Sequence, residues 1–117
     1  MTETNSVQIG LDVGALAVKI AVKRSDSSVE SFYRFHKGNP EKTIVEIIDE
    51  IGASTSKVAI TGSGGRGIAN KLNLFFIDPA VSLIAACDGY DDIRHIIDIG
   101  GGSLSIVDLD EQKRFSG

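Results

Sequence analysis

Cysteine is almost absent from this 117-residue chain, and so are the other marks of a secreted or membrane protein. The single cysteine, Cys87, excludes an internal disulfide framework and makes no metal site without help from His36, His95 or another subunit. Apolar runs such as residues 75–77 are far too short to cross a bilayer, and residues 1–6 lack the basic and apolar start of a signal peptide. We therefore expect a cytoplasmic protein with no membrane partner.

Basic charge is also scarce. Twelve Lys and Arg stand against sixteen Asp and Glu, and the formal net charge is −4. The basic pairs at 23–24 and 113–114 are isolated, so the chain has no electrostatic footprint for nucleic acid, and we expect no such partner. The hydrophobic share of 42% and the charged share of 24% are ordinary for a globular domain with a modest core.

The first third of the chain alternates apolar with small or polar side chains, which is the pattern of half-buried strands. It predicts strands at residues 7–13, 16–22 and 29–35. Gly14-Ala15 is short enough to join the first two as a hairpin. Three consecutive strands with tight links predict an antiparallel meander.

The apolar period then becomes helical. Asn39 can cap a helix that starts at Pro40, and Gly52 can end it. The remaining pattern predicts a strand at 57–61, a helix at about 66–72, a short strand at 75–77, a helix from Asp78-Pro79 to about Asp88 that Gly89 closes, strands at 94–99 and 103–109 around a turn at 100–102, and a last strand at 112–115.

The order of these elements is that of a ribonuclease H-like α/β fold, a mixed sheet flanked by helices. We predict that residues 1–93 form this domain. Residues 94–117 would be the first hairpin of a second domain.

The first group with chemical potential is Asp12, Gly14 and Lys19. An aspartate at a strand end can hold hydrated Mg²⁺ while the N–H groups of the following turn face a phosphate, and the lysine on the returning strand could reach the same phosphate. Taken alone, this group is better explained as an ordinary hairpin with a solvated lysine.

The second group is Asp98 with the glycines at 100–102 and Ser103. Three glycines between two apolar strands cost backbone entropy without adding core, so we favour close approach to a phosphate over a structural turn. A third glycine-rich loop, at residues 61–65, precedes a helix and could bind an anion. It lacks the spacing of a P-loop or a dinucleotide fingerprint, so an anion site and a plain loop stay open there.

The order of these groups along the chain indicates which known arrangement of phosphate loops they resemble. Asp12 and Asp98 are 86 residues apart (98 minus 12), each in an Asp–x–Gly hairpin. This layout resembles the two phosphate loops of the actin, sugar-kinase and heat-shock-chaperone superfamily. The short separation, together with the strings YRFH at 33–36, TIVEII at 43–48 and VAITGSGG at 58–65, resembles the activator ATPases of 2-hydroxyacyl-CoA dehydratases and benzoyl-CoA reductase. The resemblance covers roughly residues 7–117.

The resemblance implies an actin-like ATPase half that binds ATP and Mg²⁺. Asp12 and Asp98 would be the catalytic and metal residues. The nucleotide contacts would come from Gly14, Ala15, Lys19, Gly100, Gly101, Gly102 and Ser103. In the intact family, ATP binding and hydrolysis change the shape of a homodimer with a bridging iron–sulfur cluster, and this drives electron transfer into a partner CoA-ester dehydratase or reductase. The cluster belongs to that full-length context and is not expected on this chain.

Two departures from the family pattern bear on turnover. Ala15-Leu16-Ala17 stands where the family usually has Ser and Thr, and Gly102-Ser103 stands where an acidic residue usually follows. The chain also stops before the cysteine- and glycine-rich segment with which such proteins continue. We therefore expect no turnover by this chain alone.

Two alternatives stay open. A small kinase of the same superfamily, similar to pantothenate kinase, would need a catalytic base, for which Asp78 is the one candidate by position. A degenerate module that only binds partners would fit the missing hydroxyl groups.

Overall fold

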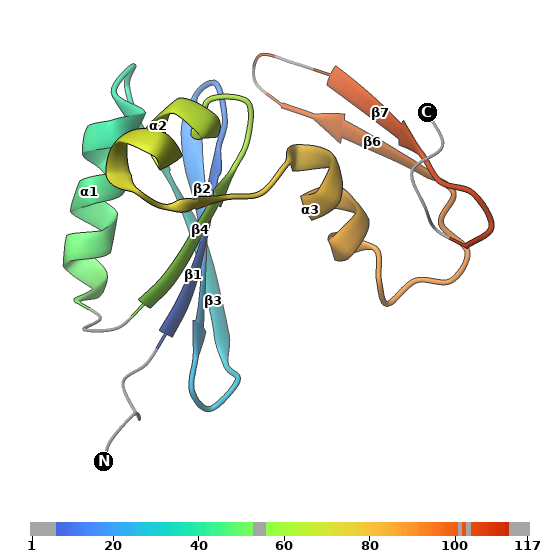
Figure 1. The fold of residues 1–117 in the computed structure, drawn as a ribbon, viewed down its shortest axis with the longest axis horizontal. Coiled ribbons are helices and arrows are strands. Elements are labelled where there is room, and N and C mark those ends of the chain that lie inside the picture. The colour runs from blue at the N-terminus through green and yellow to red at the C-terminus, as the bar shows by residue number, and fades with distance from the viewer. Residues whose placement is uncertain (1–6, 53–55, 101, 103, 113–117) are drawn as a thin grey trace.

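The computed structural model describes residues 7–52, 56–100, 102 and 104–112. These residues form a five-stranded sheet of order β3–β2–β1–β4–β5 and a separate two-stranded sheet, β6–β7. Figure 1 shows α1 and α2 on one side of the larger sheet, with α3 and the β6–β7 hairpin on the other. The described part of the chain is therefore a mixed α/β structure, as the sequence predicted.

The larger sheet begins as an antiparallel meander. β1 (Val7–Val13) pairs with β2 (Ala17–Arg24), and β2 pairs with β3 (Val29–Phe35). β4 (Ser56–Thr61) then pairs in parallel with β1, and β5 (Phe75–Phe76) pairs in parallel with β4. The antiparallel start and the ribonuclease H-like strand order are both confirmed.

Local caps define the first helix, α1 (Pro40–Ile51), as predicted. The Asn39 side chain accepts a hydrogen bond from the Lys42 N–H at 3.2 Å, and Pro40 needs no such partner. Gly52 ends the helix at φ +66°, a left-handed conformation that suits glycine. Both ends of α1 are thus set by residues next to each other in the sequence.

The core lies between one face of the sheet and helices α1 and α2 (Gly65–Leu72). Every second residue of β1 and β2 points into it because side chains alternate along a strand. The buried members are Val7, Ile9, Leu11, Val13, Val18, Ile20, Val22, Ile44, Ile47, Ile60 and Ala69.

An ion pair outside the core also links α1 to the sheet. The Arg34 guanidinium on β3 donates two hydrogen bonds of 2.9 Å to the Glu50 carboxylate. These hydrogen bonds hold the pKa of Glu50 below its ordinary value, because they favour the ionised carboxylate.

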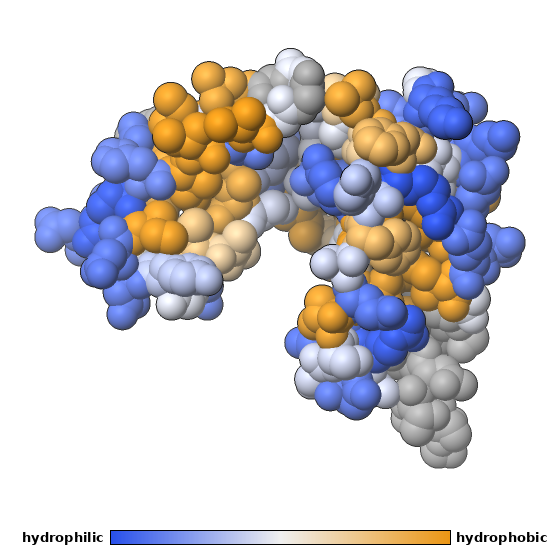
Figure 2. Space-filling model, turned by 180° about the vertical axis from the view of Figure 1, so that it is seen from behind, coloured by the Kyte–Doolittle hydropathy of each residue, from blue (hydrophilic) through white to orange (hydrophobic). Residues whose placement is uncertain are grey.

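The small sheet leaves apolar side chains in solvent. β6 (His95–Ile99) and β7 (Leu104–Asp108) pair Ile97 with Ile106 and Ile99 with Leu104, and all four side chains are exposed. Figure 2 shows this hydrophobic surface over the hairpin.

Several predicted boundaries differ from the structure by one or two residues, among them the end of β2 at Arg24, the start of β4 at Ser56 and the end of β5 at Phe76. β2 begins at Ala17, because Leu16 is still in the turn. α3 (Pro79–Ala86) ends two residues before Asp88, because the N–H groups of Cys87 and Asp88 bond only three residues back and tighten the last turn. Gln112 lies in a turn, where its N–H donates a hydrogen bond to the Asp110 side chain. The rest of the predicted last strand lies outside the described residues.

Among the described helices, none combines the length and the apolar character needed to span a membrane.

Candidate functional site

A cleft of about 470 Å³ opens where the two Asp–x–Gly hairpins, the end of β4 and α3 meet. This volume lies within the range of small-molecule sites. The cleft is lined by residues of β1, β2, β3, β4, α3, β6 and β7, so segments from nearly the whole length of the chain contribute to it.

The Asp12 and Lys19 side chains stand opposite each other on β1 and β2. The Lys19 Nζ lies 3.5 Å from the Asp12 Oδ2, and each side chain is about half exposed, at 51% and 49%. An ion pair this exposed contributes little stability, so both groups can exchange partners at low cost. The ammonium group of Lys19 and the carboxylate of Asp12 are therefore both available to a ligand at one edge of the cleft.

Gly14 makes the turn that lets Lys19 reach this edge. The Gly14 N–H donates to the Ala17 carbonyl at 2.9 Å and closes the turn between β1 and β2. The position that a Gly14 Cβ would occupy lies 2.8 Å from the Lys19 Nζ. A side chain here would therefore displace the ammonium group from the turn.

The end of β4 packs directly on the end of β1. Thr61 is the parallel neighbour of Asp12, and the following residue, Gly62, is buried with φ +103°. A Cβ on Gly62 would clash with the Val13 carbonyl oxygen and would lie 2.7 Å from the Asp12 Oδ1. The Thr61 Oγ1 is buried without a hydrogen-bond partner among the described residues. Gly62 thus allows the end of β4 to approach the Val13 backbone and the Asp12 side chain closely.

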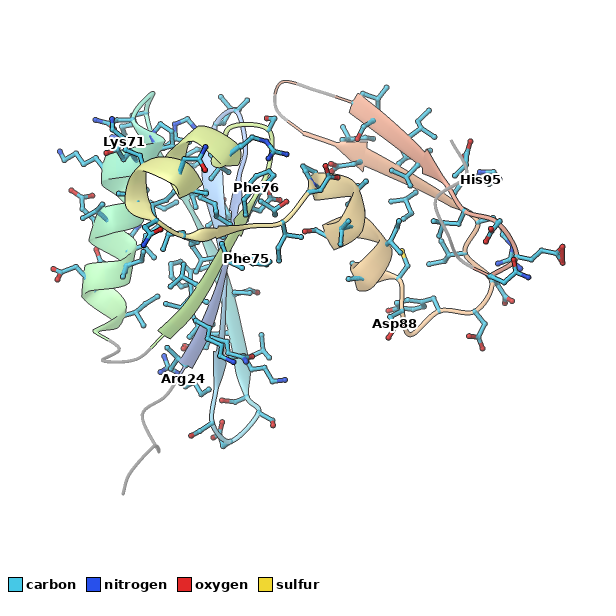
Figure 3. The ribbon with its side chains drawn as sticks, in the orientation of Figure 1. Arg24, Lys71, Phe75, Phe76, Asp88 and His95 are labelled. Carbon is cyan, nitrogen blue, oxygen red and sulfur yellow. The ribbon has the colours of Figure 1, made fainter. Side chains whose placement is uncertain are left out.

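The second hairpin brings Asp98, Gly100 and Gly102 to the same cleft. The position of a Gly102 Cβ lies 2.8 Å from the Ala15 Cβ, so the two hairpin loops approach closely. His95, labelled in Figure 3, lies at the opposite end of β6 from this loop and bonds to Asp108 at 2.7 Å. It takes no part in the cleft.

The structure brings together most residues predicted from the sequence. The predicted residues that line the cleft are Asp12, Gly14, Ala15, Lys19, Asp98, Gly100 and Gly102. Gly101 and Ser103 lie outside the described residues. The geometry places these residues in one cavity, and their chemical roles stay predictions.

Sequence reasoning left other lining residues out of the predicted site. Thr61, Gly62 and Ser63 belong to the glycine-rich loop that the sequence left open between an anion site and a plain loop. Ser82 and Leu83 come from α3, whose sequence carries no signal for a site. Asp78, the base that a kinase would need, caps α3 by accepting the Ala80 N–H at 2.9 Å and is not among the lining residues.

The donor set fits a hydrated magnesium ion. Among the described residues no three His, Cys, Asp or Glu side chains gather closely enough to form a full metal cage. Mg²⁺ does not require one, because it keeps several waters and takes one or two carboxylates together with phosphate oxygens. The carboxylates of Asp12 and Asp98 both line the cleft and could supply that share.

No known family model and no curated protein matches the chain. Solved structures do. The activator of 2-hydroxyisocaproyl-CoA dehydratase from Clostridium difficile, solved with bound ADPNP, has a TM-score of 0.64 at 22% identity, and the match covers 95% of this chain and 44% of that one. Component A of (R)-2-hydroxyglutaryl-CoA dehydratase from Acidaminococcus fermentans has a TM-score of 0.67 at 18% identity, and the match covers 95% of this chain and 45% of that one. An ethanolamine utilization protein from Carboxydothermus hydrogenoformans has a TM-score of 0.61 at 16% identity, and the match covers 95% of this chain and 50% of that one.

These similarities establish the fold. The chain has the actin-like ATPase fold of the dehydratase activators, so the resemblance seen in the sequence is confirmed at the level of fold. It spans about half the length of the structures that it matches.

Proposed function

We propose that this chain binds Mg·ATP in the cleft, as the nucleotide-binding domain of an activator ATPase. The observation that carries this proposal is the meeting of Asp12, Lys19 and Asp98 at one cavity. The two aspartates belong to separate sheets, and a chain without a shared ligand has no packing reason to gather a lysine and two exposed aspartates around glycine turns.

Each group has a task in this proposal. Lys19 leaves Asp12 and neutralises phosphate charge. Asp12 and Asp98 would hold Mg²⁺ through its water ligands, which would supply screening of the phosphate charge. The loops offer backbone N–H groups, which bind phosphate without a side chain. These would come from Gly14, Ala15, Gly100, Gly101, Gly102 and Ser103.

The coupled reaction is proposed from the structural neighbours. Two of them are the activator or component A of a CoA-ester dehydratase, and one was solved with an ATP analogue. In our proposal, ATP binding and hydrolysis in the full-length protein change the shape of a cytoplasmic homodimer. That change drives electron transfer into a dehydratase or reductase acting on CoA esters. The iron–sulfur cluster would be bound outside this chain.

The exposed apolar face of the β6–β7 hairpin supports the proposed domain boundary. A two-stranded hairpin is barely stable by itself, and four exposed aliphatic side chains call for a covering layer. We therefore propose that residues 94–117 begin a second domain, while residues 1–93 form the first.

Calorimetric titration of the 117-residue chain with Mg·ATP and Mg·ADP tests the nucleotide site. We expect dissociation constants weaker than about 1 μM, or about −8 kcal/mol, because the chain spans half of its neighbours and offers mainly phosphate contacts. Lys19→Gln should weaken binding of both nucleotides. The matched control is Lys23→Gln, which removes the same charge from β2 at a residue outside the cleft.

Two results would contradict the proposal. Equal affinities of the K19Q and K23Q variants would remove Lys19 from the site. Absence of any heat of binding at millimolar nucleotide would favour a module that only binds partner proteins.

A further inference from the structure

His36 follows β3 and lies behind the loop that carries Gly14 and Ala15. It is one of the few buried polar residues, with 8% of its surface exposed, and it does not line the cleft. Both of its ring nitrogens have partners. The Nδ1 lies 3.1 Å from the Gly38 backbone nitrogen, and the Nε2 lies 3.0 Å from the Gly14 carbonyl oxygen.

These partners select one tautomer of the ring. The Gly38 N–H can only donate, so the Nδ1 of His36 must be the unprotonated acceptor. The Gly14 carbonyl can only accept, so the Nε2 must carry the proton and donate it. With these two partners the ring of His36 is in the Nε2–H tautomer.

Backbone hydrogen bonds connect the ring to more of the loop. The His36 N–H donates to the Leu16 carbonyl at 3.1 Å, so one residue binds the loop at both Gly14 and Leu16. The His36 carbonyl in turn accepts the N–H of Asn39, the cap of α1, at 2.8 Å. A continuous chain of hydrogen bonds thus runs from the start of α1 to the first loop of the cleft.

The peptide plane gives this contact a consequence for the cleft. A trans peptide is planar, and the Gly14 C=O and the Ala15 N–H lie in that plane and point in opposite directions. A carbonyl held on His36 therefore turns the Ala15 N–H away from His36. Ala15 itself lines the cleft, and an N–H is the group with which such a loop binds an anion.

We propose that His36 is a positioning residue for the cleft. Its Nε2–H holds the Gly14 carbonyl and thereby presents the Ala15 N–H to an anionic ligand. The identity of that ligand rests on the proposed nucleotide site, whereas the positioning of the loop does not. The loop keeps one orientation before any ligand arrives, so little conformational entropy is lost on binding.

Two amide substitutions separate positioning from mere packing. In His36→Gln, the amide NH₂ stands near the Nε2 position and can still donate to Gly14, while the bond from Gly38 is lost. In His36→Asn, the amide oxygen stands near the Nδ1 position and can still accept from Gly38, while the bond to Gly14 is lost. Each variant removes one hydrogen bond of the ring, so their stabilities should fall to a similar extent.

The ligand-independent test is amide hydrogen exchange followed by nuclear magnetic resonance. The reporter is the Gly14 N–H, which bonds across the turn to Ala17. We expect faster exchange at Gly14 in H36N than in H36Q, with H36Q close to wild type. Equal rates in the two variants would overturn the proposal, as would ¹⁵N chemical shifts of the wild-type ring that report a proton on Nδ1. If only H36Q folds, exchange at Gly14 faster than in wild type overturns it.

The ligand-dependent test is titration with Mg·ATP. We expect H36N to bind about three- to tenfold more weakly than wild type, as for the loss of one hydrogen bond, and H36Q to bind as wild type does. Equal losses in both variants would mean that His36 only supports the fold, which overturns the proposal. If wild type does not bind nucleotide, the nucleotide site is wrong, and the exchange rates alone decide the role of His36.

Discussion

Replacing Gly62 with alanine tests whether close contact between β4 and β1 positions the cleft. Gly62 has φ +103°, which strains any residue with a Cβ. The added methyl would also clash with the Val13 carbonyl oxygen and would lie 2.6 Å from the Val13 nitrogen. Both of these atoms belong to the backbone, so no side-chain rotation relieves the clash, and β1 and β4 must separate.

The cost of this change can be worked out from its two parts. The left-handed backbone contributes about 1–2 kcal/mol for alanine. Forcing two packed strands apart adds about 1–3 kcal/mol, the usual range for overpacking. The free energy of unfolding should therefore fall by about 2–5 kcal/mol. This is a large share of the 5–15 kcal/mol that is typical of a folded domain.

Urea denaturation monitored by circular dichroism measures this loss as a lower midpoint at an unchanged slope. The matched control is Gly67→Ala in α2, where the added methyl meets no atom within 4 Å. Alanine should raise stability there by about 0.5–1 kcal/mol, because glycine is the poorer helix former. The same substitution five residues apart should thus act with opposite sign. A midpoint for G62A equal to that of wild type would refute the argument that β1 and β4 are held together at this glycine.

Two further predictions address the metal and the ion pair between β3 and α1. Asp98→Ala should weaken Mg·ATP binding about 10- to 100-fold, as for loss of a residue that orients metal ligands, and should leave metal-free ATP binding unchanged. Asp108→Ala, on the same hairpin but outside the cleft, should change neither in the same titration. The pKa of Glu50 is lower in the folded state than its unfolded value of about 4.5. Ionised Glu50 therefore stabilises the fold at any pH above that unfolded pKa. This stability is lost as the pH falls through the lower pKa of the folded state. The stability difference between wild type and Glu50→Gln should therefore be present at pH 7 and vanish when the same comparison is made in acid.

Features decided by neighbouring residues could be predicted from the sequence. The cap at Asn39 and the stop at Gly52 act within a few residues, and both appear in the structure where the sequence predicts them. The alternation in β1 reflects a buried face and a more exposed face. The bounds of β3 were also predicted correctly, although none of its residues is buried. The two Asp–x–Gly hairpins indicated a phosphate-binding layout before any contact between them was known.

Contacts between distant segments could not be predicted from such local patterns. The glycine run at 61–65 was visible, but its role depends on β4 pairing beside β1, which places Gly62 against the Val13 backbone. Likewise, the string YRFH contains the histidine, but it does not indicate that the ring bonds to Gly14, 22 residues earlier.

The sequence by itself determined the type and order of the main elements, and it supplied the candidate residues for phosphate and metal binding. These depend on periodicity, turn chemistry and side-chain type, which act over a few residues. Only the tertiary structure decided that Asp12 and Asp98 line one cleft, that α3 forms part of its wall, and that the ring of His36 bonds to Gly14. The physical reason is that strand pairing and packing join residues far apart in the chain, and short-range patterns carry no information about which of these meet.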